Sequence, residues 1–462
     1  MFMNLFSKIA RPFAVLLLAV ATVPNPSMAA EQAPRSIQHD DSWIYSGTDI
    51  PRDPEWVFGA LDNGLRYAVR RNNVPPGQIS IRIRVDAGSL YETRSEQGFA
   101  HLLEHLLFRQ SKYLAEGQAI PTWQRLGATF GSDTNAETTP TQTVYKLDLP
   151  NSSAASLEES FRLLSGMVRE PALTQANINT EVPIVLAEKR ERGGASQRVF
   201  EATRKPFFAG QPLAEGNPIG TDETLRGATQ DAVRAFHARW YRPENVVIVA
   251  VGDADPMMLA AQIEKWFNDW RGKGALAPAP DFGKPEAPEG SDPANPVGEA
   301  QVLMEPDLPP MINYAVLRPY EQVLDNLEYN RGLMLDAIAQ AIINRRLEAR
   351  ARGGGSYLFA QVSQDDVSRS ADGTFVSITP LDGNWQAALK DVRAVIADAV
   401  AAPPSEAEIA REVAELDVAF ASRVEERAVM AGAQLADDVV QAVDIREAVA
   451  TPETVLEVFR DM

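Results

Sequence analysis

The stretch His101-Leu-Leu-Glu104-His105 decides how this 462-residue chain is interpreted. It spells H-x-x-E-H, the inverted form of the zinc-peptidase helix signature. Residues four apart lie on one face of a helix, so both imidazoles can reach the same metal ion. Glu104 lies on the adjacent part of that face, close enough to act on a metal-bound water.

The residues around this motif predict a helix. Thr93-Arg-Ser-Glu96 has the pattern of a capping box, which satisfies free N–H groups where a helix starts. Apolar residues then recur at helical spacing: Phe99, Leu102, Leu103, Leu106 and Leu107. The alternative interpretation is a pair of hydrogen-bonded histidines in a protein core. The position of the glutamate favours the metal site.

A tetrahedral catalytic zinc needs three protein ligands and one open position. The candidate third ligand lies in Glu181-Val-Pro-Ile-Val-Leu-Ala-Glu188-Lys-Arg-Glu191. Glu181 and Glu188 are about two helical turns apart, so they share a face. The alternative is a solvated acidic helix paired with the neighbouring basic residues. Beside the histidine motif, Glu188 is the expected ligand, with Glu181 or Glu191 as substitutes.

Four blocks occur in a fixed order: residues 98–108, 127–145, 181–188 and 240–253. Together they resemble the zinc metallopeptidases of the pitrilysin/insulinase family, the group that includes the mitochondrial processing peptidases. The resemblance implies that Glu188 ligates zinc and that Glu181 supports a ligand from behind. It also implies that Asn135 and Ala136 lie on a strand edge beside the bound peptide, which would pair with it by strand addition.

The second half of the chain repeats the order of the first. We expect strands at 301–305, 312–318, 357–363 and 374–381, and helices at 324–349, 385–402 and 405–440. No histidine follows His237, so this half is expected to be a sister domain without metal.

The resemblance implies that two homologous domains enclose a chamber like a clamshell. It also implies that Arg350 and Tyr357 face the zinc across that chamber. Arg350 would bond a peptide carbonyl and Tyr357 would stabilise a developing oxyanion. The alternative is an arginine that ends a helix and an ordinary strand tyrosine.

The predicted fold class is α+β, with a mainly antiparallel sheet packed by helices in each domain. In the first domain we expect strands at 56–61, 65–70, 78–86, 141–149 and 246–251, with 78–86 half-buried.

The expected domain division is a signal peptide at 1–30, a polar leader at 31–52, a zinc-bearing domain at 53–273, a proline-rich linker at 274–298 and the sister domain at 299–462. The helix expected at 451–462 has no strand after it. We therefore expect the second domain to be incomplete here, and to be completed by further C-terminal sequence or by a partner chain.

The N-terminus has the pattern of a secretory signal. Lys8 and Arg11 precede an apolar run at 13–23, and small residues follow at 27–30. An uncleaved anchor is the alternative. The chain contains no cysteine, which excludes disulfides, thiol nucleophiles and cysteine metal ligands and fits a periplasmic or secreted protein. The formal net charge of −19 argues against nucleic acid and anionic membranes as partners.

These observations predict an exported zinc endopeptidase, with one zinc per chain, that acts on peptides and small unfolded proteins. Glu104 would be the general base. Two alternatives belong to other classes: a non-catalytic structural or partner subunit of the same fold, and a metal-dependent protein that holds peptides without cutting them.

Overall fold

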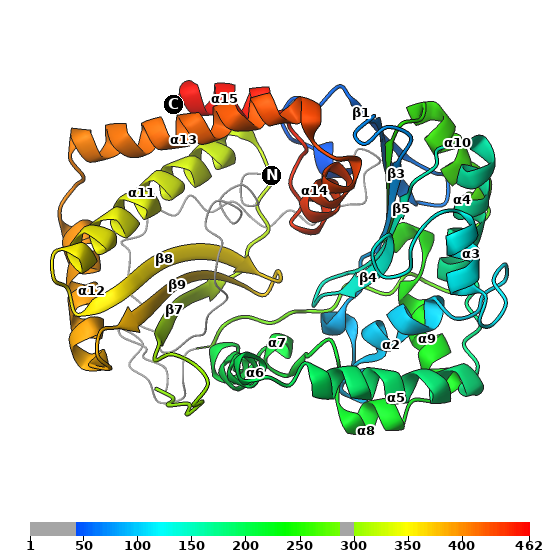
Figure 1. The fold of residues 1–462 in the computed structure, drawn as a ribbon, viewed down its shortest axis with the longest axis horizontal. Coiled ribbons are helices and arrows are strands. Elements are labelled where there is room, and N and C mark those ends of the chain that lie inside the picture. Colours follow the sequence, from blue (N-terminus) through cyan, green and yellow to red (C-terminus); the bar gives the residue numbers. More distant parts are fainter. Residues whose placement is uncertain (1–42, 287–299) are drawn as a thin grey trace.

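A computed structural model describes residues 43–286 and 300–462 (Figure 1). The expected signal peptide, residues 31–42 of the leader and residues 287–298 of the linker lie outside the described residues. Two sheets stand apart in Figure 1, each with its own helices. The predicted α+β class is confirmed.

The first sheet has six strands in the order β1-β2-β6-β3-β5-β4. These are β1 (Trp56–Ala60), β2 (Arg66–Arg71), β3 (Ile79–Val85), β4 (Thr134–Thr138), β5 (Thr143–Leu149) and β6 (Val246–Gly252). Only the β2–β6 pair is parallel. The predicted hairpin across residues 62–64 joins β1 to β2, and Gly64 takes the positive φ of 87° that this turn requires. The expected strands of this half are all present.

The first sheet shares its main apolar core with nine helices of the described residues. They are α2 (Phe99–Leu107), α3 (Ala119–Arg125), α4 (Ala154–Arg169), α5 (Gln175–Glu191), α6 (Ala195–Phe207), α7 (Pro212–Glu215), α8 (Asp222–Arg226), α9 (Gln230–Trp240) and α10 (Pro256–Phe267). Short 3₁₀ turns occur at Trp43–Tyr45, Ser89–Tyr91, Arg94–Glu96, Pro243–Asn245 and Arg427–Val429. This arrangement holds α2 and α5 against each other.

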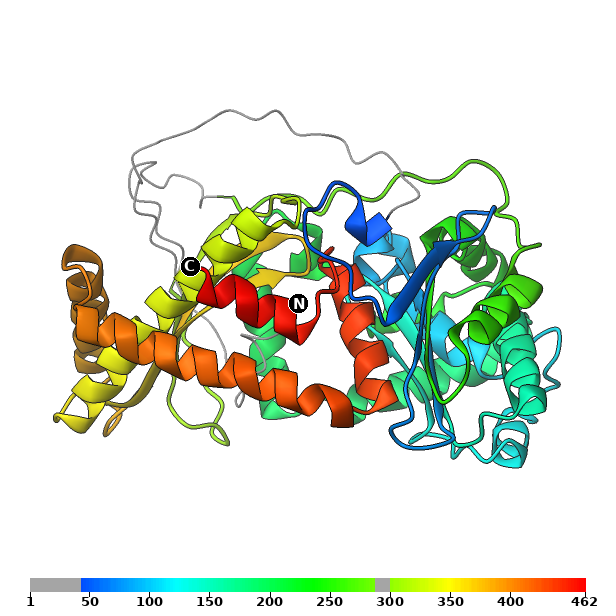
Figure 2. The same ribbon diagram turned by 90° about the horizontal axis from the view of Figure 1, so that it is seen from above.

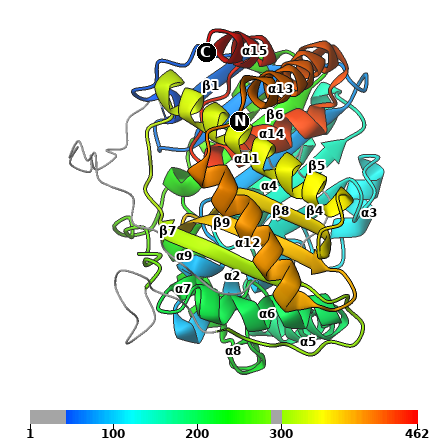
Figure 3. The same ribbon diagram turned by 90° about the vertical axis from the view of Figure 1, so that its left-hand side faces the viewer.

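The second sheet is antiparallel, with the order β7-β9-β8. Its strands are β7 (Ile312–Pro319), β8 (Tyr357–Val367) and β9 (Ala371–Pro380). The helices of this half are α11 (Leu327–Arg352), α12 (Trp385–Ala401), α13 (Glu406–Glu426), α14 (Gly432–Asp444) and α15 (Pro452–Arg460). Figure 3 shows α11 and α12 lying across the second sheet. The single helix expected at 405–440 is two helices, because the chain turns at Arg427–Val429.

The strand expected at 301–305 does not form. The apolar run Val302-Leu303-Met304 is present, but Val302 and Met304 are exposed and no strand pairs with them among the described residues. Glu305 instead forms an ion pair with Arg198 of α6, with Nη2 2.6 Å from Oε2. A strand needs a partner as well as a pattern, and this segment lacks one.

Helix α14 covers the face of the first sheet that the other helices leave open. Leu435, Val439 and Val443 pack against alternate residues of β6, Val247 and Val249 among them. In Figures 1 and 2, α14 lies between the first sheet and the long helices of the second half. A segment expected in the sister domain is therefore part of the packing of the first sheet.

The expectation that residues 78–86 form a half-buried strand is wrong, because every residue of β3 is buried. Arg82 and Arg84 alternate with the apolar residues of this strand and lie under α14. Arg82 pairs with Asp148 and with Asp437 of α14, at 2.9 and 2.8 Å. Buried guanidinium groups are tolerated only with such partners.

Residues 43–50, expected to belong to a polar leader, pack among the helices of the second half. Tyr45 and Ile50 share an apolar cluster with Phe420 of α13 and Phe459 of α15. The Tyr45 hydroxyl donates to the carbonyl of Val449 at 2.6 Å. In the part of the chain that the structure describes, no helix has the length and apolar character to span a bilayer.

Candidate metal centre

Helix α2 starts at Phe99, after Gly98, whose φ is 91°. The predicted capping box is present, but it closes the preceding turn Arg94–Glu96 and not α2. The carboxylate of Glu92 accepts hydrogen bonds from the backbone N–H groups of Gly98 at 2.9 Å and Ala100 at 2.8 Å. These bonds satisfy N–H groups at the buried start of the helix, which have no partner within the helix. Burial raises the pKa of Glu92 well above its usual range. A side chain at position 98 would meet the Cα of Gly220 at 2.9 Å, so a glycine is needed there.

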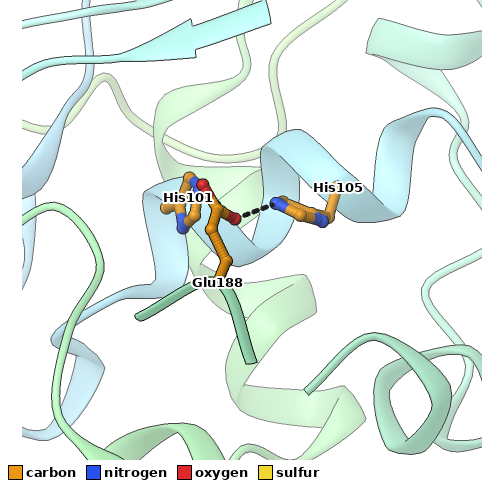
Figure 4. A group of neighbouring side chains, drawn as sticks. All are labelled: His101, His105 and Glu188. Atoms are coloured by element: carbon orange, nitrogen blue, oxygen red, sulfur yellow. Dashed lines mark ion pairs between the residues drawn. The ribbon is translucent and has the colours of Figure 1, made fainter. Parts of the chain in front are cut away.

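The two histidines of α2 face Glu188 of α5 (Figure 4). Oε2 of Glu188 lies 3.6 Å from Nε2 of His101 and 3.3 Å from Nε2 of His105. The three candidate ligand atoms all lie within 4.8 Å of one another. The structure therefore brings together the three ligands that the sequence predicted.

The donor set fits zinc. Two imidazole nitrogens and one carboxylate oxygen are a known catalytic combination that leaves a fourth position open. Arg192 pairs with Oε1 of Glu188, so Oε2 is the oxygen that faces the histidines. Burial, and then the neighbouring His105, lower the pKa of His101 to about 3. A neutral imidazole is the form that binds a metal.

Glu181 contacts His105 on the side away from Glu188 and is not one of the three candidate ligands. Its Oε2 is 3.3 Å from Nδ1 of His105, and its Oε1 is 2.5 Å from Nη1 of Arg109. Burial opposes ionisation of Glu181, but His105 and Arg109 outweigh it and lower its pKa. Metal-binding histidines are commonly oriented by such a carboxylate.

Glu104 is not one of the grouped ligands. Its Oε2 accepts a hydrogen bond from the hydroxyl of Thr138 on β4 at 2.6 Å. Burial raises the pKa of Glu104, and the Thr138 bond opposes that shift. The bond fixes this carboxylate on the β4 side of α2, beside the histidines.

Strand β4 is the edge strand of the first sheet next to α2. It pairs with β5 on one side, and no other described strand pairs with its second side. Asn135 is exposed on it, and its Oδ1 accepts the amide of Ala136 at 2.9 Å. An edge strand of this kind can accept an extended peptide as an added strand.

Arg350 and Tyr357 are not brought to this group. The Tyr357 hydroxyl is buried and donates to the carbonyl of Leu347 at 2.7 Å. Nε of Arg350 donates to Asp391 at 2.8 Å. In Figure 1 the end of α11 and the start of β8 lie at the far side of the second sheet from α2 and α5. The expected orientation towards the metal is corrected: in this structure Tyr357 packs inside its own lobe, and the exposed Arg350 pairs with Asp391 of that lobe.

Three residues near the site are not among the predicted site residues. Arg109 follows His105 by one helical turn, and Arg192 follows Glu188 by one turn. This spacing could have predicted that both arginines lie near the site, because residues four apart share a helix face. Thr138 reaches Glu104 only because β4 folds beside α2, and nothing local in the sequence shows that contact.

Comparisons with known proteins agree with this site. The sequence model of the insulinase family (peptidase family M16) matches residues 67–218, and that of the peptidase M16 inactive domain matches residues 227–416. The probable zinc protease PqqL of Escherichia coli (strain K12) is 31% identical over 215 residues, which are 46% of this chain and 23% of that protein. The zinc protease PQQL-like of Arabidopsis thaliana is 30% identical over 233 residues, 50% of this chain and 24% of that protein.

The fold has solved counterparts. The crystal structure of the first half of the periplasmic protease PqqL from Escherichia coli superposes with a TM-score of 0.79 at 22% identity, covering 89% of this chain and 86% of that one. Against the crystal structure of the periplasmic protease PqqL itself, the chain covers 45% of the relative. The chain thus spans less than half the length of the PqqL structure, and its matched residues cover about a quarter of the two curated relatives. By its two family matches and its grouped His101, His105 and Glu188, the chain belongs to the insulinase family of peptidases, peptidase family M16.

Proposed function

We propose that this protein is an exported zinc-dependent endopeptidase that hydrolyses peptides and small unfolded proteins. The observation that carries the proposal is the meeting of His101, His105 and Glu188, whose ligand atoms lie within 4.8 Å of one another. Glu104 stands beside them on α2, with its carboxylate bonded to Thr138. The family membership and the zinc proteases among the relatives support the same chemistry.

His101, His105 and Glu188 would hold one zinc per chain. When bound, zinc makes water nucleophilic near neutral pH and polarises the scissile carbonyl. Glu104 takes the proton of the attacking water and delivers it to the leaving amine. Glu181 orients His105 through Nδ1, and Arg109 holds Glu181 in place.

The substrate lies along β4. Its backbone pairs with the open edge at Asn135 and Ala136, which sets the scissile bond beside Glu104 because Thr138 of the same strand bonds that carboxylate. Strand addition uses hydrogen bonds to the main chain of the substrate, which must be extended to form them. The preferred substrates are therefore extended or unfolded segments.

The expected place of action is the periplasm. The predicted signal peptide and the periplasmic protease PqqL among the structural relatives support export. Because relatives are about twice as long, we propose that further sequence or a partner chain closes a clamshell chamber over the site. The formal net charge of −19 argues against nucleic acid as a binding partner, and the proposed function needs no stable insertion into a membrane.

Four purified variants test the proposal against a non-catalytic subunit and a peptide-holding protein. His101→Ala and His105→Ala should lose zinc and cleavage together. Glu104→Gln should keep zinc, measured by elemental analysis, and lose cleavage of an unstructured fluorogenic peptide. Glu191→Gln, at the exposed end of α5, is the matched control and should change neither. A zinc-loaded wild-type protein that binds peptides but does not cut them would reject the enzyme in favour of the holding protein.

A further inference from the structure

The hairpin that joins β8 to β9 turns through residues 368–370 in an unusual conformation. Ser368 and Arg369 have φ of 53° and 55°, in the left-handed region that non-glycine residues seldom adopt. Such a conformation persists when surrounding contacts fix it, and it is a reason to ask what the turn holds.

Arg369 extends from this turn into the first lobe, where it is 9% exposed. Its Nη2 donates to Oδ1 of Asp86 at 3.0 Å and to the carbonyl of Thr141 at 3.2 Å, and lies 3.4 Å from Oδ1 of Asp444. Burial alone would raise the pKa of Asp86, but Arg84 and Arg369 hold it far below its usual range. The arginine is therefore locked in a charged, buried cluster.

The rest of the hairpin tip is also packed into the first lobe. The carbonyl of Ser370 accepts a hydrogen bond from Nε2 of Gln211 at 2.8 Å. Ala371 is fully buried in the main apolar core beside the first sheet. Along the sequence the hairpin belongs to the second sheet, but its tip is anchored in the first lobe.

The Thr141 carbonyl, which accepts the hydrogen bond from Arg369, belongs to the turn between β4 and β5. The Thr141 hydroxyl donates to Oδ2 of Asp444 at 2.9 Å, and the Thr139 amide donates to the carbonyl of Gln142 at 2.8 Å. Three residues before Thr141, Thr138 ends β4 and donates its hydroxyl to Glu104 at 2.6 Å. The hairpin tip of the second sheet is thus one short turn away from the proposed general base.

We infer that Arg369 is a positioning residue for Glu104, acting through the β4–β5 turn and the Thr138 hydroxyl. The inference rests on the proposed function, since it takes Glu104 as the base. Through this contact the metal-free half of the chain sets the geometry of the catalytic carboxylate without touching substrate. A misplaced base slows proton transfer more than it weakens substrate binding, because binding along β4 does not need it.

A double-mutant cycle on the full zinc-loaded protein tests the coupling. Arg369→Gln and Thr138→Val should each lower kcat about tenfold, the loss typical of removing a supporting contact. KM should change less than about twofold and zinc content should stay at wild type. Because Arg369 acts through Thr138, the double variant should be no slower than Thr138→Val alone. Arg318→Gln, on β7 and bonded within its own sheet to Thr374, is the control and should match wild type.

A folded Arg369→Gln protein with wild-type kcat, or losses that multiply in the double variant, would overturn the inference. If Arg369→Gln does not fold, Arg369→Lys replaces it. Lysine keeps the positive charge beside Asp86, but its side chain is shorter and lacks the guanidinium group that reaches the Thr141 carbonyl. The kcat of this variant should therefore still fall, and an unchanged kcat would overturn the coupling.

A crystal structure of the Arg369 variant gives a readout that does not depend on turnover. The turn should shift and the Thr138–Glu104 hydrogen bond should be lost; an unmoved bond would overturn the inference. Glu104→Gln in the same series isolates the proposed function. If Glu104→Gln cuts peptide at the wild-type rate, that function fails. If Glu104→Gln is inactive and the Arg369 variants are normal, only the inference fails.

Discussion

Nδ1 of His105 lies 3.3 Å from Oε2 of Glu181, while Nε2 of the same ring faces Glu188. A hydrogen bond donated by Nδ1 fixes the tautomer of the imidazole and leaves the lone pair of Nε2 free for a metal. Glu181 and Glu188 stand on the same face of α5, but the proposed function gives them different tasks: Glu181 orients His105 and Glu188 is a metal ligand.

This difference predicts an order of zinc affinities. Glu181→Gln keeps a hydrogen-bond acceptor near His105 and should weaken zinc binding by about tenfold to a hundredfold. Glu188→Gln removes a carboxylate that neutralises the metal directly and should weaken it further. Competition titration with a chromogenic chelator measures both, with Glu191→Gln as the control on the same helix. Equal affinity in the Glu188 variant and wild type would move the ligand role to another carboxylate.

Tyr357 offers a test between resemblance and structure. Its hydroxyl is buried and bonded to the Leu347 carbonyl, so Tyr357→Phe should cost about 1 kcal/mol of unfolding free energy and leave kcat unchanged. The family resemblance instead expects Tyr357→Phe to lower kcat more than it raises KM. Denaturant unfolding and peptide kinetics on the same preparation decide between them. A kcat loss without destabilisation would show that the hydroxyl leaves Leu347 during turnover.

The parts of the site that follow helical spacing could be predicted from sequence. His101, Glu104 and His105 lie within one helix, and Glu181 and Glu188 within another, so periodicity alone set their faces. The need of a catalytic zinc for a third ligand links the two helices through Glu188, and the family resemblance implies the same assignment. The strands of the first sheet were predictable for the same local reason, since each carries its own apolar alternation.

Contacts made by distant segments could not be predicted. Arg82 and Arg84 alternate with apolar residues as a solvent-facing side of a strand would, yet α14 arrives more than 350 residues later to bury them. The Thr138–Glu104 bond and the Arg369 cluster are of this kind too. Arg350 and Tyr357 matched a family spacing, but spacing does not reveal which way a segment points once the lobe has folded.

His237 predicts one source of acid sensitivity. Burial lowers the pKa of His237 to about 4, against about 6.5 for an exposed histidine, and its Nε2 lies 2.9 Å from the Val168 carbonyl. The folded state binds fewer protons than the unfolded state between these values, so stability falls as pH drops from 6.5 towards 4. The loss across that window is on the order of 3 kcal/mol.

The measurement is the pH dependence of unfolding free energy in His237→Gln. Glutamine keeps a hydrogen-bond donor for the Val168 carbonyl and cannot titrate. The slope of unfolding free energy against pH between 6.5 and 4 should therefore become flatter, by an amount that corresponds to the uptake of up to one proton on unfolding. The stacking of His237 on Tyr241 is lost, which lowers stability equally at every pH and does not imitate the effect. An identical slope in both proteins would mean that the imidazole becomes charged without unfolding.

The packing of α14 predicts that the first lobe does not fold without it. A chain of residues 43–286 contains the whole first sheet and all the proposed metal ligands, but it exposes the face formed by Val247, Val249 and their neighbours. Large exposed apolar faces of this kind lead to aggregation. The fragment should therefore aggregate or bind a hydrophobic dye, and Arg82 would lose Asp437.

Joining residues 430–446 to the fragment through a flexible linker should restore a soluble, cooperatively unfolding protein that binds zinc. The matched control carries Val439→Asp in the added helix, which places a charge where an apolar side chain meets the sheet. Calorimetry and zinc titration compare the three. A monomeric fragment 43–286 that unfolds cooperatively by itself would show that the boundary expected at residue 273 marks an independent domain, with α14 only resting on it.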